Sequence, residues 1–286
     1  MFTTDGFVVE PIFFPGGDIG KLAVCGTVND LAAAGARPLA LSASFILEEG
    51  LLISELERIV DSMAAAAAEA GVRVICGDTK VVPRGSADRM YVTTSGVGEV
   101  PEGVEVSGAN ARPGDVVLVS GPVGDHGLAV LSVREGLEFE SEIVSDCAPL
   151  AGMVEALLEA APGVHALRDP TRGGLATALN EIARQSEVEI EIEESAVPVR
   201  ESVAAACELL GLDPLYAANE GKMIVIAAAA QADKALAALR AHPLGREAAV
   251  IGRVQQGKAG RVLLRTVLGT HRILDRHVGE QMPRIC

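Results

Sequence analysis

The 286-residue sequence contains no tryptophan, two tyrosines and six phenylalanines, so aromatic residues make up only 3% of it. Hydrophobic residues nevertheless make up 49%, which excludes an intrinsically disordered chain. Much of this apolar content is alanine, which is typical of helices with small side chains. The longest apolar run, residues 223–230, is far shorter than the roughly 20 residues that a membrane-spanning helix needs. The length suggests about two domains, with a core large enough to fold without disulfides or structural metals.

Basic residues are also scarce, because 24 Lys and Arg stand against 39 Asp and Glu, a net charge of −15. This charge opposes nonspecific binding to nucleic acids and to anionic membranes, so neither is an expected partner. An acidic protein can still bind ATP, since Mg²⁺ and positioned backbone amides can hold the phosphates. The first residues show no basic region followed by an apolar segment, and we therefore expect a cytoplasmic protein.

The five cysteines form no CxxC pair, so zinc binding and thioredoxin-like chemistry have little support. Their odd number and scattered positions are typical of reduced thiols in a reducing compartment. Cys25, Cys76, Cys147 and Cys207 are predicted to be small buried hydrophobic residues. Cys286 differs from them because it is the last residue of the sequence.

Apolar segments and turn signals alternate in the way that predicts an α/β protein of two domains. We expect each domain to be a mixed sheet covered by helices on one face. Turn-forming residues on both sides of position 107 suggest the boundary. We place an N-terminal domain at residues 1–107 and a C-terminal α/β domain at residues 108–258. Residues 259–286 are predicted to hold a last strand and then, from residue 270, a flexible tail that ends in Cys286.

Several common catalytic and nucleotide-binding motifs are missing. The nearest match to a P-loop, within residues 15–22, lacks its first glycine and the hydroxyl residue that holds magnesium. The sequence has no complete dinucleotide fingerprint, no HExxH and no GxSxG. Its five histidines form no ligand pair at helical spacing. Any nucleotide site must therefore be built from other residues.

Four aspartates stand where a charge is unexpected. Asp5 interrupts the first predicted strand, Asp30 lies in an otherwise apolar helix, and Asp78 and Asp169 follow the ends of strands. Each alone could be an ordinary turn or cap residue. Together they offer hard oxygen ligands at strand ends, where α/β proteins bind ligands, and such ligands suit Mg²⁺ and polyphosphate. Whether the four converge in space is not visible in the sequence.

Three further residues have the chemistry to complete such a site. Lys80 lies two positions after Asp78 and could both pair with it and contact a phosphate or an oxyanion. Arg172 precedes two glycines at the start of a predicted helix, which resembles an anion site. Glu220 lies in a turn before a strand and could be a general base or simply a surface turn residue.

The motifs around these residues resemble those of the HypE family of hydrogenase-maturation proteins. The matching stretches are residues 4–6, 13–17, 26–31, 77–82, 124–127, 168–174 and 219–222, and the final Pro-Arg-Ile-Cys resembles the C-terminal signature of the family. The Gly-Asp-Thr-Lys motif and the terminal cysteine distinguish this family from its relatives. Those are the aminoimidazole ribonucleotide synthetases, the selenophosphate synthetases and the thiamine monophosphate kinases.

The resemblance implies a two-domain fold that forms a homodimer through the N-terminal domain, with ATP at that interface. The implied activity is the ATP-dependent dehydration of a carboxamide on the terminal cysteine to a thiocyanate. A carbamoyltransferase partner supplies the carboxamide. The cyanide then passes to iron on a scaffold complex of two other maturation proteins.

The resemblance also implies a role for each candidate residue. Cys286 would carry the substrate, Glu220 would be the base, and Lys80 would stabilise the amide oxygen or the phosphoryl group in transfer. The implied nucleotide site comprises Asp5, Asp30, Asp78 and Asp169 as Mg²⁺ and triphosphate ligands, together with Thr79 and Arg172.

One departure from the family concerns the start of the sequence. The family has a segment before the motif at residues 4–6, with a glycine-rich loop and paired acidic residues, which this sequence lacks. Its absence puts ATP affinity in question. One alternative is therefore an ATP-inactive carrier that docks on the transferase and the iron scaffold. A separate alternative is a related ATP-dependent small-molecule synthetase or kinase of the same superfamily.

Overall fold

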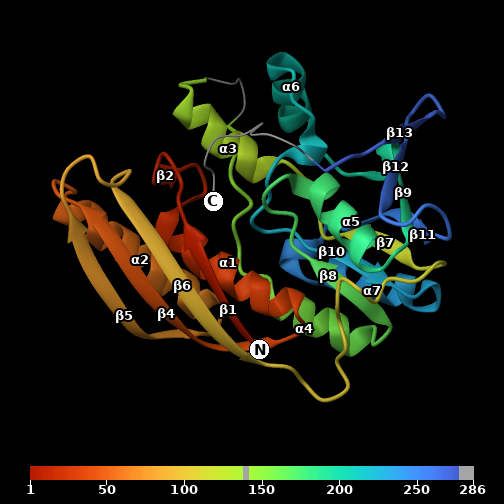
Figure 1. Ribbon diagram of the computed structural model, residues 1–286, viewed down its shortest axis with the longest axis horizontal. Coiled ribbons are helices and arrows are strands. Elements are labelled where there is room, and N and C mark those ends of the chain that lie inside the picture. The colour runs from red at the N-terminus through yellow and green to blue at the C-terminus, as the bar shows by residue number, and fades with distance from the viewer. Residues whose placement is uncertain (138–141, 277–286) are drawn as a thin grey trace.

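The computed structural model describes residues 1–137 and 142–276, which form two halves, each built on one sheet (Figure 1). The first half holds a four-stranded sheet in the order β1-β6-β4-β5, in which β4 and β5 are parallel and the other neighbours antiparallel. Its elements are β1 (Phe2–Phe7), β2 (Phe13–Phe14), β3 (Gly17–Asp18), α1 (Ile19–Ala33), β4 (Arg37–Glu48), α2 (Ile53–Glu69), β5 (Arg73–Val82) and β6 (Met90–Glu99).

Helix α1 lies at the centre of the molecule. The Asp18 carboxylate caps its first turn by accepting hydrogen bonds from the N–H groups of Gly20 and Lys21, at 2.8 and 3.0 Å. The helix ends before Gly35, which has a φ of 71° that favours glycine. It is buried on nearly all sides because it contacts β1, β4 and β6 of the first half and α4 and β8 of the second. One helix can therefore place side chains against both halves.

The first sheet is covered by helices on one face only. Burial alternates along β6, since one face packs on α1 and the other does not. Strand β5 is the outer strand and is exposed along almost its whole length. Its exposed residues include Val74, Ile75 and Val81. This half of the molecule therefore presents an open strand edge with apolar side chains.

The second half holds a seven-stranded sheet in the order β13-β12-β9-β11-β7-β10-β8, in which only β9 and β12 are parallel neighbours among the described strands. Its strands are β7 (Val116–Val119), β8 (Val164–Arg168), β9 (Glu189–Glu193), β10 (Ile224–Ala227), β11 (Ala249–Gln255), β12 (Arg261–Arg265) and β13 (His271–Ile273). Its helices are α3 (Asp125–Arg134), α4 (Ala151–Ala160), α5 (Gly174–Gln185), α6 (Glu201–Leu210) and α7 (Ala232–Ala241), with short 3₁₀ turns at Glu194–Ala196, Pro214–Tyr216, Ala229–Gln231 and Pro243–Gly245.

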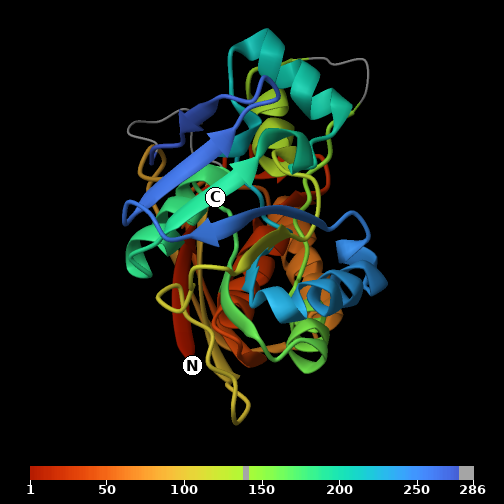
Figure 2. The same cartoon turned by 90° about the vertical axis from the view of Figure 1, so that its right-hand side faces the viewer.

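Helices cover both faces of this second sheet, which Figure 2 turns toward the viewer. Alternate residues of β7 pack into two different cores. Val117 and Val119 pack with residues of α5, whereas Val116 and Leu118 pack with residues of α4 and α7. The expectation of helices on one face is therefore wrong for this half. The reason lies in β7 and β10, whose residues are all buried, because a strand covered on both sides is apolar throughout rather than alternating. The prediction of two mixed α/β sheets covered by helices is confirmed.

The end of the described chain differs from the expectation in detail. Strand β12 lies where a last strand is predicted, but β13 pairs with it and Leu274 is buried beyond it. The sheet thus extends past residue 270, where the tail was expected to begin. The domain boundary at residue 107 stays a prediction, and Cys286 lies outside the described residues. Within those residues, no helix is long and apolar enough to cross a membrane.

Candidate functional site

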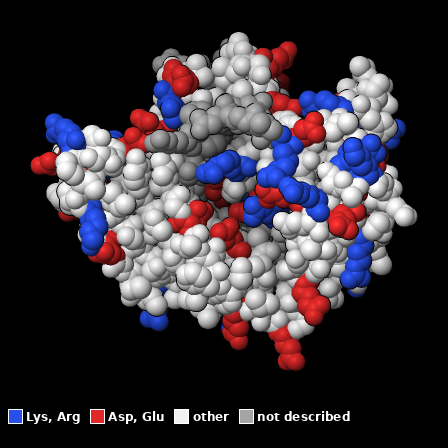
Figure 3. All heavy atoms as spheres, viewed as in Figure 1, with Lys and Arg blue, Asp and Glu red and all other residues white. Residues whose placement is uncertain are grey.

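Four of the predicted acidic residues gather where β1 and α1 of the first half face the second half. Asp5 lies on β1, Asp30 on α1, Asp169 directly after β8 and Glu220 shortly before β10. Strands β8 and β10 are antiparallel neighbours, with Arg168 opposite Ile224, so the chain segments that carry Asp169 and Glu220 lie side by side. Figure 3 shows acidic and basic side chains gathered near the middle of the face that Figure 1 turns toward the viewer. We call Asp5, Asp30, Asp169 and Glu220 the acidic cluster.

The carboxyl of Asp169 is almost completely buried, with the residue 5% exposed. Its pKa is raised to about 6, chiefly by burial and then by the nearby charge of Asp30, against the opposing effect of Arg168. Its Oδ1 atom has no hydrogen-bond partner among the described residues and lies 3.8 Å from Arg168 Nη1. A buried carboxylate oxygen without a hydrogen bond is suited to bind a cation.

Asp30 and Asp5 extend the cluster toward solvent. Burial raises the pKa of Asp30, although the Thr3 hydroxyl donates to its Oδ2 at 2.9 Å. Partial burial also raises the pKa of Asp5, against a hydrogen bond from the N–H of Gly6 and the charge of Arg172. The structure therefore brings Arg172 into electrostatic range of Asp5, on the solvent side of the acidic cluster.

Glu220, the predicted base, is the most deeply buried residue of the acidic cluster. It is 3% exposed, and its Oε1 has no hydrogen-bond partner in the described part of the chain. Burial raises its pKa well above the usual range, and the charges of Asp169, Asp146 and Asp5 act in the same direction. The Oε1 atom of Glu220 thus makes no hydrogen bond to the described residues, and the pKa of the carboxyl depends strongly on the neighbouring charges. Both properties suit a group that accepts and releases a proton. The alternative of a surface turn residue is wrong.

Asp78, Thr79 and Lys80 do not join the acidic cluster within one chain. They lie on β5, and β4 and β6 separate that strand from β1, a distance of roughly 14 Å across the sheet. Lys80 Nζ lies 2.7 Å from Asp78 Oδ2, as the sequence suggested, and both side chains are mostly exposed. The hydrogen bond from Lys80 lowers the pKa of Asp78. These residues form a separate patch on the open edge of the first sheet.

Three residues near Glu220 were not predicted from the sequence. Asp146 Oδ1 accepts a hydrogen bond from the Glu220 N–H at 3.0 Å, and Lys222 Nζ lies 3.0 Å from the other carboxylate oxygen of Asp146. Asn29 donates from Nδ2 to the Glu220 carbonyl at 3.1 Å. Asn29 and Lys222 lie within the family-like motifs beside Asp30 and Glu220, which was a signal for them. No sequence signal marks Asp146.

The internal cysteines differ in their surroundings. Cys25, Cys147 and Cys207 are buried as predicted, whereas the prediction is wrong for Cys76, which is exposed because it lies on β5. Cys25 and Cys147 come from the two halves and meet beside Glu220. A hydrogen bond between the two thiols is the main cause that raises the pKa of Cys147.

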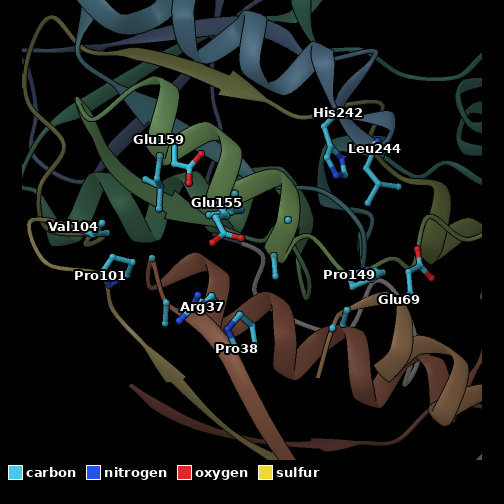
Figure 4. Close-up of a pocket in the computed structure, with 18 of the residues that line it drawn as sticks. Arg37, Pro38, Glu69, Pro101, Val104, Pro149, Glu155, Glu159, His242 and Leu244 are labelled. Carbon is cyan, nitrogen blue, oxygen red and sulfur yellow. Dashed lines mark hydrogen bonds between the residues drawn. The ribbon is translucent and has the colours of Figure 1, made fainter. Parts of the chain in front are cut away.

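A cavity of about 670 Å³ lies elsewhere between the halves. Figure 4 shows Glu155 of α4 on one wall and Arg37 and Pro38 on the other, with His242 and Leu244 at one end. None of the predicted site residues lines this cavity. Nor do three or more His, Cys, Asp or Glu residues of the described chain already form a set that could hold a metal ion. Metal binding by the acidic cluster therefore stays a prediction.

Comparison with known proteins assigns the family. Residues 1–100 match the family model for the AIR synthase related protein, N-terminal domain, and residues 112–265 match the model for its C-terminal domain. The "Carbamoyl dehydratase HypE" of Cupriavidus necator is 59% identical over 286 residues, which is 100% of this chain and 82% of that protein. The chain belongs to the HypE family of AIR synthase related proteins.

Solved structures of HypE proteins have the same fold. The crystal structure described as the hydrogenase maturation protein HypE in complex with ATP has a TM-score of 0.97 at 55% identity, covering 100% of this chain and 86% of that one. A HypE–HypF complex has a TM-score of 0.94 at 53% identity, covering 96% of this chain and 90% of that one. The predicted family and its fold are thereby confirmed, and within the HypE family one solved member holds ATP and another is bound to HypF.

Proposed function

We propose that this chain is an ATP-dependent carbamoyl dehydratase, which converts a carboxamide on Cys286 to a thiocyanate for the maturation of a hydrogenase iron centre. The observation that carries the proposal is the acidic cluster around Glu220, in a chain 59% identical to a HypE named for this activity. The HypE neighbour that holds ATP supports the same nucleotide here.

The chemistry requires two kinds of assistance. The oxygen of an amide is a poor leaving group. The terminal phosphoryl group of ATP is therefore first transferred to this oxygen, which then leaves as part of phosphate. The nitrogen loses its two protons as the carbon–nitrogen triple bond forms. The sum is thiocyanate, ADP and phosphate from the carboxamide and ATP. A base near the amide nitrogen and cations near the phosphates are therefore needed.

Glu220 has the environment required of that base. Its carboxyl is buried away from water, and its Oε1 makes no hydrogen bond to the described residues. Its pKa is raised by burial and then by Asp169, Asp146 and Asp5. Neutralising the charges of Asp169 and Asp5 would lower that pKa and favour the ionised form of Glu220, which can accept a proton.

The acidic cluster is the proposed site of the predicted Mg²⁺. Asp169 offers a buried carboxylate oxygen without a hydrogen bond, and Asp30 and Asp5 lie within its electrostatic range. Mg²⁺ bound to these oxygens and to the phosphates would neutralise charge that develops during phosphoryl transfer. Arg172 would contact phosphate at the exposed side of the cluster.

A homodimer is part of the proposal. The exposed apolar residues of β5 form the kind of open edge on which a second copy can pack. Because Lys80 and Asp78 lie on this same edge, dimerisation would place them at an interface rather than in solvent. A nucleotide held there could contact groups from both copies, including Thr79.

The transferase is the proposed partner that loads Cys286, by analogy with the solved HypE–HypF complex. The product cyanide would pass to a scaffold of two further maturation proteins that carries iron. The cytoplasmic location stays a prediction.

The separation of Lys80 from Glu220 within one chain favours a second candidate, an ATP-inactive carrier that offers Cys286 to these partners. Binding to the carbamoyltransferase and turnover of Mg-ATP, measured side by side, distinguish the two. The dehydratase binds the transferase and consumes ATP in proportion to the carboxamide loaded on Cys286. A carrier binds equally well without consuming ATP, and that result would contradict the proposed function.

A further inference from the structure

The backbone of Glu220 is held by a side chain from the other half of the molecule. Asn29 of α1 is 1% exposed, and its Nδ2 donates hydrogen bonds to the carbonyl oxygens of Glu220 and Ala148, both at 3.1 Å. Its Oδ1 accepts the N–H of Leu150 at 2.8 Å. Both amide hydrogens and the amide oxygen are therefore used, which fixes the orientation of the side chain.

The two loops that Asn29 holds also contact each other closely. The Asp146 carboxylate accepts the Glu220 N–H at 3.0 Å, and the Ala148 N–H donates to the Glu220 carbonyl at 3.4 Å. A side chain at Gly221 would collide with the backbone carbonyl of Asp146, so only glycine fits this approach. Glu220 thus has every backbone polar group bonded, while its carboxyl Oε1 has no hydrogen-bond partner among the described residues.

This division of contacts points to a role in catalysis. A base must lie within hydrogen-bond reach of the proton that it removes, and a displacement of about 1 Å can cost about 100-fold in rate. The Glu220 side chain makes no hydrogen bond at Oε1 that could fix its position, so the backbone has to do so. Asn29 supplies that restraint from α1, the helix that also carries Asp30 and Cys25.

We infer that Asn29 is a positioning residue for Glu220, which fixes the base of the second half relative to the nucleotide-binding carboxylates of the first. The inference rests on the proposed function. It assigns to Asn29 no contact with substrate or nucleotide, since all its polar atoms are bonded within the protein.

The test is the single-turnover rate of thiocyanate formation in the full chain carbamoylated on Cys286, as a function of Mg-ATP. The Asn29→Ala variant is expected to lose about 100-fold in the rate constant at saturating ATP. The ATP concentration for half-maximal rate should stay unchanged, as should acceptance of the carbamoyl group. Asn29→Asp keeps the size of the side chain and the acceptor for Leu150 but, when ionised, loses both donors, so it should show a similar loss.

The same variants in a Glu220→Gln background separate positioning from simple support of the fold. Because Asn29 acts through Glu220, Asn29→Ala should not lower the rate of thiocyanate formation further in the Glu220→Gln chain. A purely structural role would lower the rate by the same factor in the wild-type and the Glu220→Gln chains. Thr27→Val is the matched control, since Thr27 is buried on the same helix but its hydroxyl bonds Thr94 of the first sheet. This variant should retain the wild-type rate within about twofold.

Three results would overturn the inference. They are an unchanged rate in Asn29→Ala, an equal loss in both backgrounds, and a change confined to the ATP concentration required, which would assign the effect to neighbouring Asp30. A wild-type chain that forms no thiocyanate would overturn the proposed function together with this inference. Wild-type turnover with any of the three results overturns the inference about Asn29 alone.

Discussion

Lys222 Nζ lies 3.0 Å from Asp146 Oδ2, and both side chains are almost completely buried. The same Asp146 accepts the N–H of Glu220 through its other oxygen. One buried ion pair therefore supports the segment that carries the proposed base. By contrast, the Lys80–Asp78 pair at 2.7 Å lies in solvent on β5. The two ion pairs have similar distances and differ instead in how far their side chains are buried.

Loss of Lys222 should destabilise the fold. In Lys222→Ala the Asp146 carboxylate stays buried without its cation, and the free energy of unfolding should fall by about 3–5 kcal/mol. Urea denaturation followed by circular dichroism measures this. Lys80→Ala is the control, because an exposed pair contributes little to stability. Equal effects of the two substitutions would show that the buried pair has no special structural role.

The Glu220→Gln variant should lose its dehydratase activity while keeping its fold. Glutamine preserves the size of the side chain and every backbone contact to Asp146 and Asn29, but it cannot accept a proton as a carboxylate does. We expect the rate of thiocyanate formation to fall by at least about 100-fold, as is usual on removal of a general base. Carbamoylation of Cys286 and the melting temperature serve as controls. A variant that still forms thiocyanate at the full rate would contradict the assignment.

Asp169 should make stability depend on pH. Its pKa is about 6 in the folded chain and near 3.8 in the unfolded chain, so the folded state binds the proton more tightly. The resulting stabilisation is complete below pH 3.8 and is lost as the pH rises through about 6. Between pH 5 and pH 7.5 this one group should lower the free energy of unfolding by about 1–1.5 kcal/mol.

Asp169→Asn should remove that part of the pH dependence, which urea denaturation at the two pH values measures. The variant should also lose any stabilisation that Mg²⁺ gives the wild type at pH 7.5, because the proposed buried ligand is gone. If the free energy of unfolding changes between pH 5 and pH 7.5 by the same amount in the wild type and in the variant, the result would contradict the raised pKa of Asp169.

The edge strand β5 should carry the dimer contact. Ile75 is 63% exposed on it, and Ile75→Glu should give a monomer in sedimentation analysis and reduce thiocyanate formation, since Lys80 would no longer lie at an interface. Val267→Glu is the matched control, because Val267 is an exposed apolar residue of the second half. A dimer that survives Ile75→Glu would place the contact elsewhere.

The sequence predicts local features better than their meeting in space. The pattern of apolar residues predicts two mixed sheets and the burial of Cys25. The convergence of Asp5 with Glu220 does not, since 215 positions separate them and only the pairing of β8 with β10 and the packing of α1 bring them together. Asp146 gives no pattern at all, because its role depends on a loop that packs against Gly221.

Two errors have the same physical origin. Helices were expected on one face of the second sheet, and Cys76 was expected to be buried. Apolar residues indicate burial but not which surface covers them, so the sequence pattern does not distinguish β7, which is covered on both faces, from β5, which is exposed. The placement of Lys80 apart from Glu220 likewise depends on strand order, which local sequence does not determine.

The most direct measurement is the intact mass of this chain after incubation with its carbamoyltransferase and carbamoyl phosphate, before and after addition of Mg-ATP. A dehydratase should gain one carbamoyl group and then lose one water on addition of ATP, with both changes mapped to Cys286. A carbamoyl adduct that Mg-ATP leaves unchanged would contradict the proposed activity and would identify the chain as a carrier.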